Sequence, residues 1–149
     1  MHMEGGHIMI PNAPGDDYKG RCPYHGACIE GMVASHALAA RKDGDITKLP
    51  TYPDDDPLWD YAAYYLAQAC MSITLLLSPE AIVISGGILN RHSLFPKIRE
   101  TFKKILNGYV SVDKIKNHLD EYIVPSTHGN NIGIISACNL SVGAHRDTK

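Results

Sequence analysis

Four metal-ligating side chains near the start of the chain constrain its fold more than any other feature. Cys22, His25 and Cys28 recur at steps of three residues in a glycine-rich loop, and His7 lies fifteen residues upstream. Thiolates and imidazoles are the ligands that zinc takes in a tetrahedron, and a tight loop can supply three of the four. A site with four protein ligands is closed, so its ion would hold a loop in place rather than activate water. The alternative is that these are ordinary loop residues whose spacing arises by chance.

The composition of the chain excludes several classes of protein. Its 149 residues suffice for about one domain, and 44% of them are apolar, which is too many for a disordered chain. Lysine and arginine number 14 against 16 acidic residues, a balance that argues against a nucleic-acid partner. The N-terminus has no basic segment followed by an apolar run, so we expect no signal peptide and a reducing, cytoplasmic location. Cys70 and Cys138 lie in apolar segments. In a reducing location we expect both to be buried as small hydrophobic side chains.

One segment is long and apolar enough to raise the question of a membrane. Residues 58–77 are apolar at 16 of 20 positions. Much of that count is alanine and tyrosine, and no lysine or arginine closely flanks either end. We therefore expect a helix that is buried on most of its faces, and no membrane partner.

The N-terminal part of the chain is predicted to hold one short strand and one helix. Residues 7–10 have the length and composition of a strand that ends at Pro11, and the residues 11–27, rich in Pro, Gly and Asp, form a loop. Mixed apolar spacing predicts a helix over 28–42. Charged residues and prolines make 43–57 a surface connection.

The rest of the chain alternates helices with short apolar strands. Asp54-Asp55-Asp56-Pro57 is typical of a helix start, with an acidic cap and a proline in the first turn. The predicted helices cover 57–77, 93–107, 113–119 and 132–143, and the predicted strands, buried on both faces, cover 81–85 and 122–124. This alternation predicts an α/β fold with a mostly parallel sheet.

Two glutamates flank the metal-ligating residues. Glu4 is three residues before His7, and Glu30 is two residues after Cys28. A metal that pins both segments would bring the two carboxylates together, and carboxylates accept hydrogen bonds from the hydroxyls of a sugar or polyol. The alternatives are a solvated surface charge and, for Glu30, a favourable charge at a helix N-terminus.

Gly86-Gly87 follows a predicted strand and precedes a predicted helix. Glycines at such a place let the backbone approach a nucleotide closely. A simple tight turn is the alternative.

Four stretches, taken in order along the chain, carry a resemblance to a known family. Glu4-Gly-Gly-His7 is similar to the Glu-x-Gly-His motif of the ROK family of sugar kinases and repressors. Residues 20–31 resemble the zinc signature of its bacterial-type fructokinase branch, in which Cys-Pro-Tyr-His replaces the Cys-x-Cys-Gly of other members. Residues 82–87 resemble the second Gly-Gly motif of the family, and residues 123–133 resemble its last strand and helix. The zinc signature is the most specific of the four.

The resemblance implies a role for each matching residue. The implied ligands of a structural zinc ion are His7, Cys22, His25 and Cys28. The residues implied to contact the sugar are Glu4, His7 and Glu30, and those implied to line the ATP site are Gly86, Gly87, Ile88, Leu89 and Asn90. The implied fold is the C-terminal half of an actin-like, ribonuclease-H-like sugar kinase. ATP, Mg²⁺ and a hexose such as fructose are the implied ligands, and a homodimer is the implied state of the complete enzyme.

The residues for phosphoryl transfer are expected upstream of this chain. The first half of ROK kinases carries an Asp-x-Gly-Gly-Thr phosphate loop and an Asn-Asp pair whose aspartate is the catalytic base, and neither motif occurs here. We therefore expect residues 1–149 to form one partial domain without a catalytic base. Its zinc loop covers 7–30, and its nucleotide-side α/β part covers 57–143.

Two functions are consistent with these features. The first is the C-terminal part of an ATP-dependent fructokinase, which transfers a phosphoryl group from ATP to D-fructose and is inactive alone. The second is a non-catalytic, zinc-stabilised module that binds a sugar or a nucleotide. A ROK repressor is disfavoured, because the sequence shows neither a winged helix-turn-helix nor a basic patch.

Overall fold

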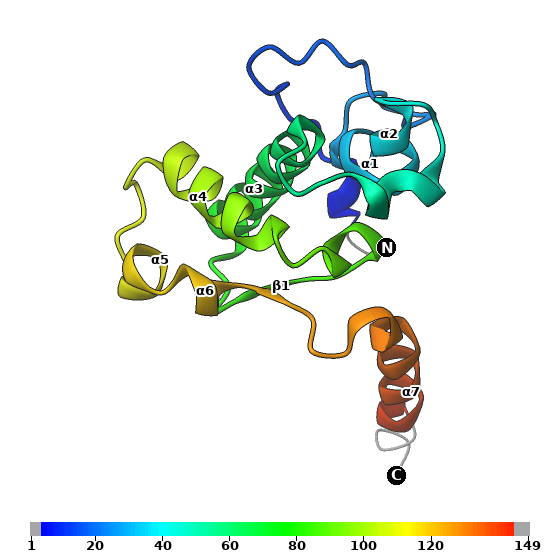
Figure 1. Cartoon of the computed structure of the whole chain (residues 1–149). Coiled ribbons are helices and arrows are strands. Elements are labelled where there is room, and N and C mark those ends of the chain that lie inside the picture. The colour runs from blue at the N-terminus through cyan, green and yellow to red at the C-terminus, as the bar shows by residue number, and fades with distance from the viewer. Residues whose placement is uncertain (1–3, 145–149) are drawn as a thin grey trace.

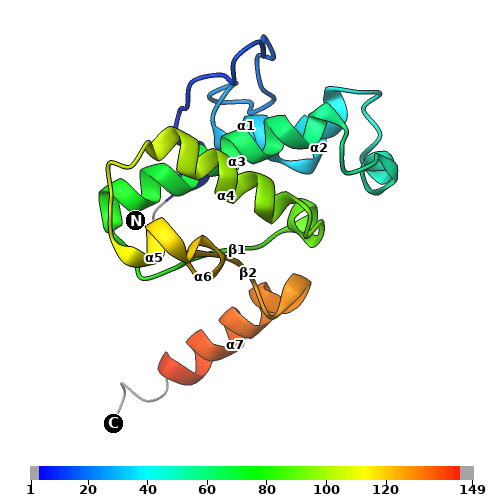
Figure 2. The same ribbon diagram turned by 60° about the vertical axis from the view of Figure 1, so that its left-hand side comes forward.

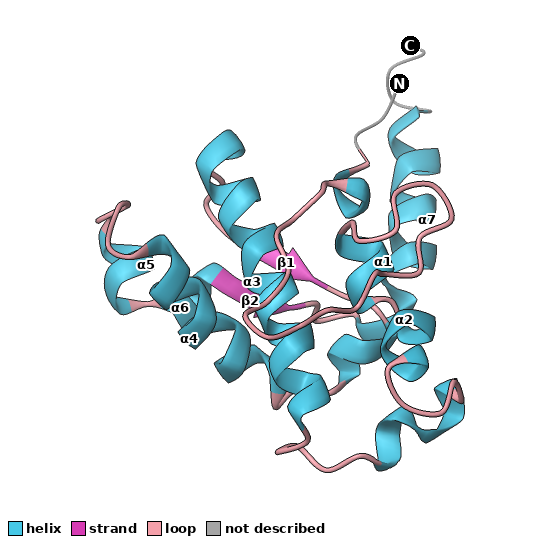
Figure 3. Ribbon diagram, turned by 90° about the horizontal axis from the view of Figure 1, so that it is seen from above, coloured by secondary structure: helices cyan, strands magenta, loops and turns pink. Residues whose placement is uncertain are grey.

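Helices make up most of the fold (Figure 3), and a very small sheet lies on one side of α3 and α4 (Figure 1). The computed structural model describes residues 4–144. Its α-helices are α1 (Ile29–Val33), α2 (Ser35–Ala40), α3 (Pro57–Leu77), α4 (Leu94–Leu106), α5 (Asp113–Asn117), α6 (Leu119–Tyr122) and α7 (Ile132–Ala144). The shorter 3-10 helices are η1 (Gly5–His7), η2 (Ile46–Thr51), η3 (Gly87–Asn90) and η4 (Gly129–Asn131), and the strands are β1 (Ile82–Ile84) and β2 (Ile123–Pro125).

The helix α3 runs through the centre of the core and packs along α4 (Figure 2). It begins as predicted, because an Asp56 carboxylate oxygen accepts a hydrogen bond from the Leu58 N–H at 2.9 Å and Pro57 occupies the first turn. It ends at Ser78, whose left-handed conformation (φ 45°) stops the helix. Trp59 and Tyr65 of α3 are buried in the hydrophobic core, so the predicted buried helix over 57–77 is confirmed.

The two strands pair in parallel, which confirms the predicted α/β class. Ile82 lies opposite Ile123 and Val83 opposite Val124. The prediction that the first strand is buried on both faces is wrong. Ile82 is buried toward the helices, whereas Val83, which points to the other face of the sheet, is 61% exposed. Helices cover the face of the sheet that carries Ile82. Within residues 4–144, no element covers the opposite face at Val83.

The N-terminal part of the chain differs from the prediction in three places. Residues 7–10 do not form a strand: His7 ends the short helix η1, and of the residues after it only Met9 pairs, in an isolated bridge with Cys28. The predicted helix over 28–42 is broken at Ala34, whose backbone is extended (ψ 152°), into α1 and α2. The break lets each short helix bury its own run of consecutive apolar residues, which no single face of one straight helix can do. The predicted surface connection 43–57 contains η2, which inserts Leu49 into the core.

The last helix, α7, projects from the body on the side of the sheet that faces away from α3 and α4 (Figures 1 and 2). None of its residues between 132 and 141 is buried. Cys138 is therefore exposed, and its predicted burial is wrong, because no other element within the described residues covers this helix. Cys70 in α3 is buried, as predicted.

No helix within residues 4–144 has the length and apolar character needed to cross a membrane. As part of α3, the segment 58–77 buries side chains in the core between Leu58 and Thr74, whereas the leucines at 75–77 are exposed.

Candidate metal and ligand sites

The four predicted metal-ligating side chains lie together, although two separate segments, η1 and the loop 22–28, contribute them. One nitrogen or sulfur atom from each of His7, Cys22, His25 and Cys28 lies within 4.8 Å of the other three. The Nδ1 atom of His7 is 3.7 Å from the Cys22 sulfur and 3.6 Å from the Cys28 sulfur. The Nδ1 atom of His25 is 3.7 Å from the Cys22 sulfur. The same ring nitrogen of each histidine therefore faces the thiols.

These separations fit the coordination shell of zinc. With zinc bonds of about 2.3 Å to sulfur and 2.0–2.1 Å to nitrogen, a tetrahedron places a sulfur and a nitrogen roughly 3.6 Å apart. The measured values of 3.6 and 3.7 Å match this edge length. Two thiols and two imidazoles are also the donor set of many structural zinc sites. The residues thus fit a closed, four-coordinate zinc ion.

Backbone packing brings the loop ligands into this arrangement. The Cys22 N–H donates to the Gly26 carbonyl at 3.2 Å, and the Gly26 N–H donates back to the Cys22 carbonyl at 2.9 Å. A side chain at Gly31 would meet the same Gly26 carbonyl oxygen at 1.9 Å, and one at Gly20, whose φ is +76°, would meet it at 2.0 Å. Both positions require glycine, because the backbone at Gly26 lies too close to them to leave room for a Cβ atom.

The two thiols differ in how readily they ionise. Burial opposes ionisation of Cys22, but hydrogen bonds from the backbone of His25 and Tyr24 outweigh it and lower the pKa of this thiol to about 6. Burial raises the pKa of Cys28, and the neighbouring negative charges of Cys22 and Glu30 raise it further. A thiolate at Cys22 is the form that binds a metal.

Glu30 lies beside the metal-ligating cluster. Its carboxylate is 3.3 Å from Nε2 of His7, the ring nitrogen that points away from the thiols. A carboxylate on the second nitrogen of a metal-binding histidine holds the orientation and tautomer of the ring. The Glu30 side chain is still 46% exposed, so it has room to accept further hydrogen bonds. Glu4 precedes η1, three residues from His7, and its carbonyl accepts a hydrogen bond from the His7 N–H at 3.0 Å.

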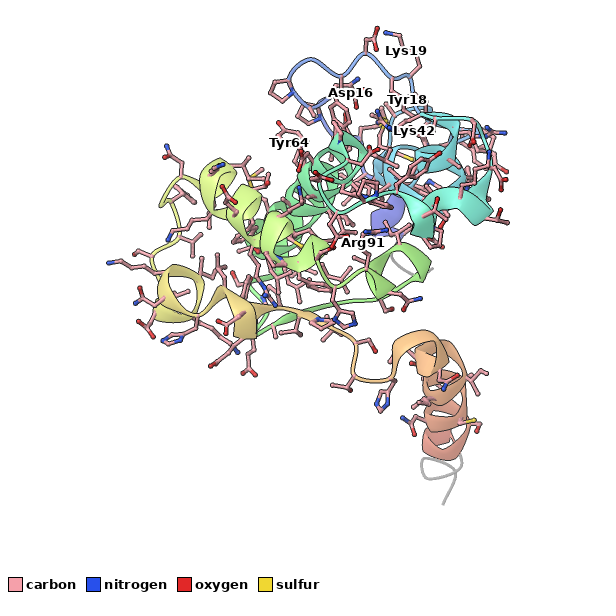
Figure 4. All side chains as sticks on the ribbon, viewed as in Figure 1. Asp16, Tyr18, Lys19, Lys42, Tyr64 and Arg91 are labelled. Atoms are coloured by element: carbon pink, nitrogen blue, oxygen red, sulfur yellow. The ribbon has the colours of Figure 1, made fainter. Side chains whose placement is uncertain are left out.

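A buried ionic cluster, which the sequence patterns did not reveal, anchors the loop that leads to Cys22. Asp16 on this loop pairs with Arg41 at the end of α2 through two contacts of 2.8 Å, and both side chains are more than nine-tenths buried. The Tyr65 hydroxyl of α3 donates to Asp16 at 2.5 Å, and the Arg41 guanidinium lies 4.1 Å from the Tyr18 ring centroid. Figure 4 shows Asp16 and Tyr18 at this end of the molecule. The contacts join residues up to 49 positions apart, so no local pattern could predict them.

A second site lies where the predicted nucleotide residues are. A cavity of about 590 Å³ opens beside η3 and is lined by Gly87, Ile88 and Asn90, together with Ser35 from the start of α2 and Trp59 from α3. Gly86, with a φ of +130°, turns the chain from β1 into this wall. Gly86 and Leu89 do not themselves line the cavity, and the side chain of Leu89 is buried in the core.

Arg91 forms the polar wall of the same cavity (Figure 4). It pairs with Asp54, and its guanidinium donates to the backbone carbonyls of Tyr52 at 2.8 Å and Pro50 at 3.1 Å. The guanidinium also stacks 4.2 Å from the Trp59 ring centroid. These contacts join Arg91, which follows η3, to the end of η2 and to the segment after it.

The fold and these two sites describe an α/β protein with a metal-ligating cluster in one loop and a cavity beside η3. The sequence model of the ROK family matches residues 1–143. The chain therefore belongs to the ROK family, and the resemblance of its four motifs is confirmed.

The chain is similar in sequence to two fructokinases and a putative fructokinase. A fructokinase from Pediococcus pentosaceus is 42% identical over 143 residues, which are 96% of this chain and 47% of that protein. A putative fructokinase from Bacillus subtilis (strain 168) is 36% identical over 143 residues, 94% of this chain and 46% of that protein. A fructokinase from Streptococcus mutans is 33% identical over 123 residues, 79% of this chain and 40% of that protein. The chain thus spans slightly less than half the length of these relatives.

Proposed function

We propose that this chain forms the sugar- and nucleotide-binding wall of an ATP-dependent fructokinase. The similarity to fructokinases supports the class of reaction. The observation that carries the proposal is the position of α1. Glu30, beside the metal-ligating cluster, lies in its first turn, and Ser35, in the wall of the cavity, follows its end. Five helical residues span roughly 7.5 Å, so a sugar held at Glu30 would lie within reach of a phosphate in the cavity.

The residues of this chain would bind and orient the substrates. Glu30 and Glu4 would accept hydrogen bonds from sugar hydroxyls, and His7 would contribute from the ring that Glu30 orients. The four ligands His7, Cys22, His25 and Cys28 would hold a structural zinc ion, which stabilises the loop that presents these groups. Gly86, Gly87, Ile88 and Asn90 would line the site of the nucleotide. ATP supplies the phosphoryl group when bound, and Mg²⁺ supplies positive charge on its phosphates.

The acceptor hydroxyl also needs a group that orients or deprotonates it, and the phosphates need a second wall. We propose that both come from the half of the fructokinase fold that this chain does not span. Alignment of reactants accounts for roughly 7–11 kcal/mol of a barrier, so a single wall should not catalyse measurably.

The proposal is tested with an assay that couples fructose 6-phosphate formation to a dehydrogenase. We expect no turnover from the chain alone, and turnover after a separately purified fragment of the Pediococcus pentosaceus fructokinase is added, namely the part that lacks a match in this chain. Turnover by the chain alone would refute the hypothesis that the catalytic base lies in the part of the fold that this chain does not span. If the mixture binds fructose or ATP but does not turn over, the chain acts as a non-catalytic binding module.

Glu30→Gln should weaken fructose binding in the reconstituted enzyme. A hydrogen bond to a charged group contributes about 1.5–3 kcal/mol, so we expect the dissociation constant measured by calorimetry to rise roughly ten- to a hundred-fold. The zinc content should not change, because Glu30 is not among the four ligands. Glu100→Gln on the exposed surface of α4 is the matched control. If Glu30→Gln bound fructose with unchanged affinity, Glu30 would not contact the sugar and would only orient the ring of His7.

A further inference from the structure

The cavity beside η3 has a second wall that none of the predicted nucleotide-binding residues supplies. Ile46, Leu49 and Pro50 of η2 line this wall, and Asp54 lines it farther along the same segment. Leu49 is the one residue of η2 that is buried. The prolines at 50 and 53 also remove two backbone donors from the segment. The position of the segment 46–54 against the cavity therefore depends on side chains that hold its backbone carbonyls.

Two side chains from other elements hold these carbonyls. Arg91, which follows η3, donates to the carbonyls of Pro50 at 3.1 Å and Tyr52 at 2.8 Å. The indole nitrogen of Trp59 in α3 donates to the Pro53 carbonyl at 2.9 Å. The Arg91 guanidinium lies over the Trp59 ring, 4.2 Å from its centroid, so each of the two side chains also holds the other in place. One stacked pair thus fixes the second wall of the cavity to the first.

The contacts of Arg91 leave it poorly suited to bind a phosphate. Its Nη2 atom carries two N–H groups, and the carbonyls of Pro50 and Tyr52 take up both. Its Nη1 atom pairs with Asp54, whose carboxylate offsets the positive charge. An arginine that binds phosphate does so through charged donors that face the ligand. Arg91 therefore acts on the wall of the cavity and not on the charge of a ligand.

We propose that Arg91 is a positioning residue for the nucleotide, because it fixes the segment 46–54 opposite Gly87 and Ile88 at the spacing that a bound nucleotide needs. This role rests on the proposed binding of ATP in the cavity. A wall that is already in place does not have to be ordered when the ligand binds. Loss of Arg91 should therefore weaken the binding of ATP and leave the fructose site and the chemical step unchanged.

Arg91→Met and Arg91→Lys are compared in the reconstituted enzyme with the coupled assay. Lysine keeps the charge but cannot hold two carbonyls and a carboxylate at once, so it should fail as methionine does. We expect KM for ATP to rise roughly tenfold or more in both variants, the effect of losing hydrogen bonds from a charged group. The kcat value and KM for fructose should change by less than about twofold.

The matched control is Lys97→Met. Lys97 also pairs with an exposed aspartate of the α3 region, Asp60, but neither residue lines the cavity. This variant should keep the KM of the unaltered enzyme for ATP.

Trp59 reports on the wall without any assay of activity. It is the only tryptophan in the sequence, and it is 2% exposed. In the full chain, its emission should move to longer wavelength and acrylamide should quench it faster in both Arg91 variants, because the guanidinium and the segment 46–54 no longer cover the ring. Lys97→Met should leave both readings unchanged.

Three results would overturn the positioning role. One is that Arg91→Lys keeps a normal KM for ATP while Arg91→Met does not, since the charge alone would then matter. Another is that kcat and KM for fructose change as much as KM for ATP, and the third is that KM for ATP stays the same in both variants.

If the unaltered chain does not turn over with the fragment, the proposed reaction fails, and the affinity of the full chain for ATP is measured by calorimetry instead. Weaker ATP binding by both Arg91 variants would still support the positioning role. An unaltered chain that binds no ATP would overturn it, so the two failures are distinguishable.

Discussion

Cys28→Ala is expected to abolish zinc binding and to loosen the loop 7–30. Cys28 is completely buried, and its sulfur lies 3.6 Å from the ring nitrogen of His7. A structural zinc ion contributes about 10–16 kcal/mol in zinc-finger peptides, so losing one of four ligands should be decisive. The zinc content measured by elemental analysis should fall from about one ion per chain to nearly none, because the tetrahedral site has lost a ligand. Hydrogen exchange should accelerate in the loop and in α1, and change little where α3 packs on α4.

Cys138→Ala is the matched control, because Cys138 is exposed and far from the cluster in sequence. It should keep the full zinc content. A wild-type chain purified without zinc, with the thiols of Cys22 and Cys28 freely titratable, would show that the cluster does not hold a metal.

Asp16→Asn should destabilise the fold strongly, although Asp16 lies outside the metal-ligating cluster. It removes the charge that neutralises Arg41 inside the protein, and breaking a buried ion pair by removing one partner costs about 3–5 kcal/mol. We expect a loss of this size in the free energy of unfolding, measured by urea denaturation. Asp17→Asn, one residue away and exposed, should change it by less than about 0.5 kcal/mol. Equal effects of the two substitutions would contradict the role of the buried pair.

The same carboxylate should make stability depend on pH. Burial opposes ionisation of Asp16, but hydrogen bonds from Arg41, Tyr65 and the Tyr18 backbone, with the charge of Arg41, outweigh it and lower its pKa below the usual 3.8. A carboxyl whose pKa is lower in the folded state than in the unfolded state stabilises the fold at every pH above the pKa of the unfolded state. This stabilisation is lost as the pH falls through the pKa of the folded state. Acid unfolding of Asp16→Asn should therefore depend less steeply on pH than that of the wild type.

Local sequence determined the elements that carry their own signals. Asp56-Pro57 caps α3, and Ser78 with Pro79 follows its end, so this helix was predictable from its two termini. The apolar segments that became β1 and β2, separated by a helical region, likewise predicted a parallel pair. The spacing of Cys22, His25 and Cys28 predicted a cluster because three ligands at short steps in one loop cannot lie far apart.

Tertiary structure alone decided the features that depend on partners distant in sequence. The break at Ala34 follows from how α1 and α2 bury separate faces, and no glycine or proline in the sequence marks it. The Asp16–Arg41 pair joins a loop to a helix end 25 residues away. The exposure of Val83 and Cys138 depends on what covers them, and their apolar surroundings in sequence do not contain that information. Hydrophobic patterns say which residues gain from burial, but burial itself requires a neighbouring surface, and only the assembled fold shows whether one is present.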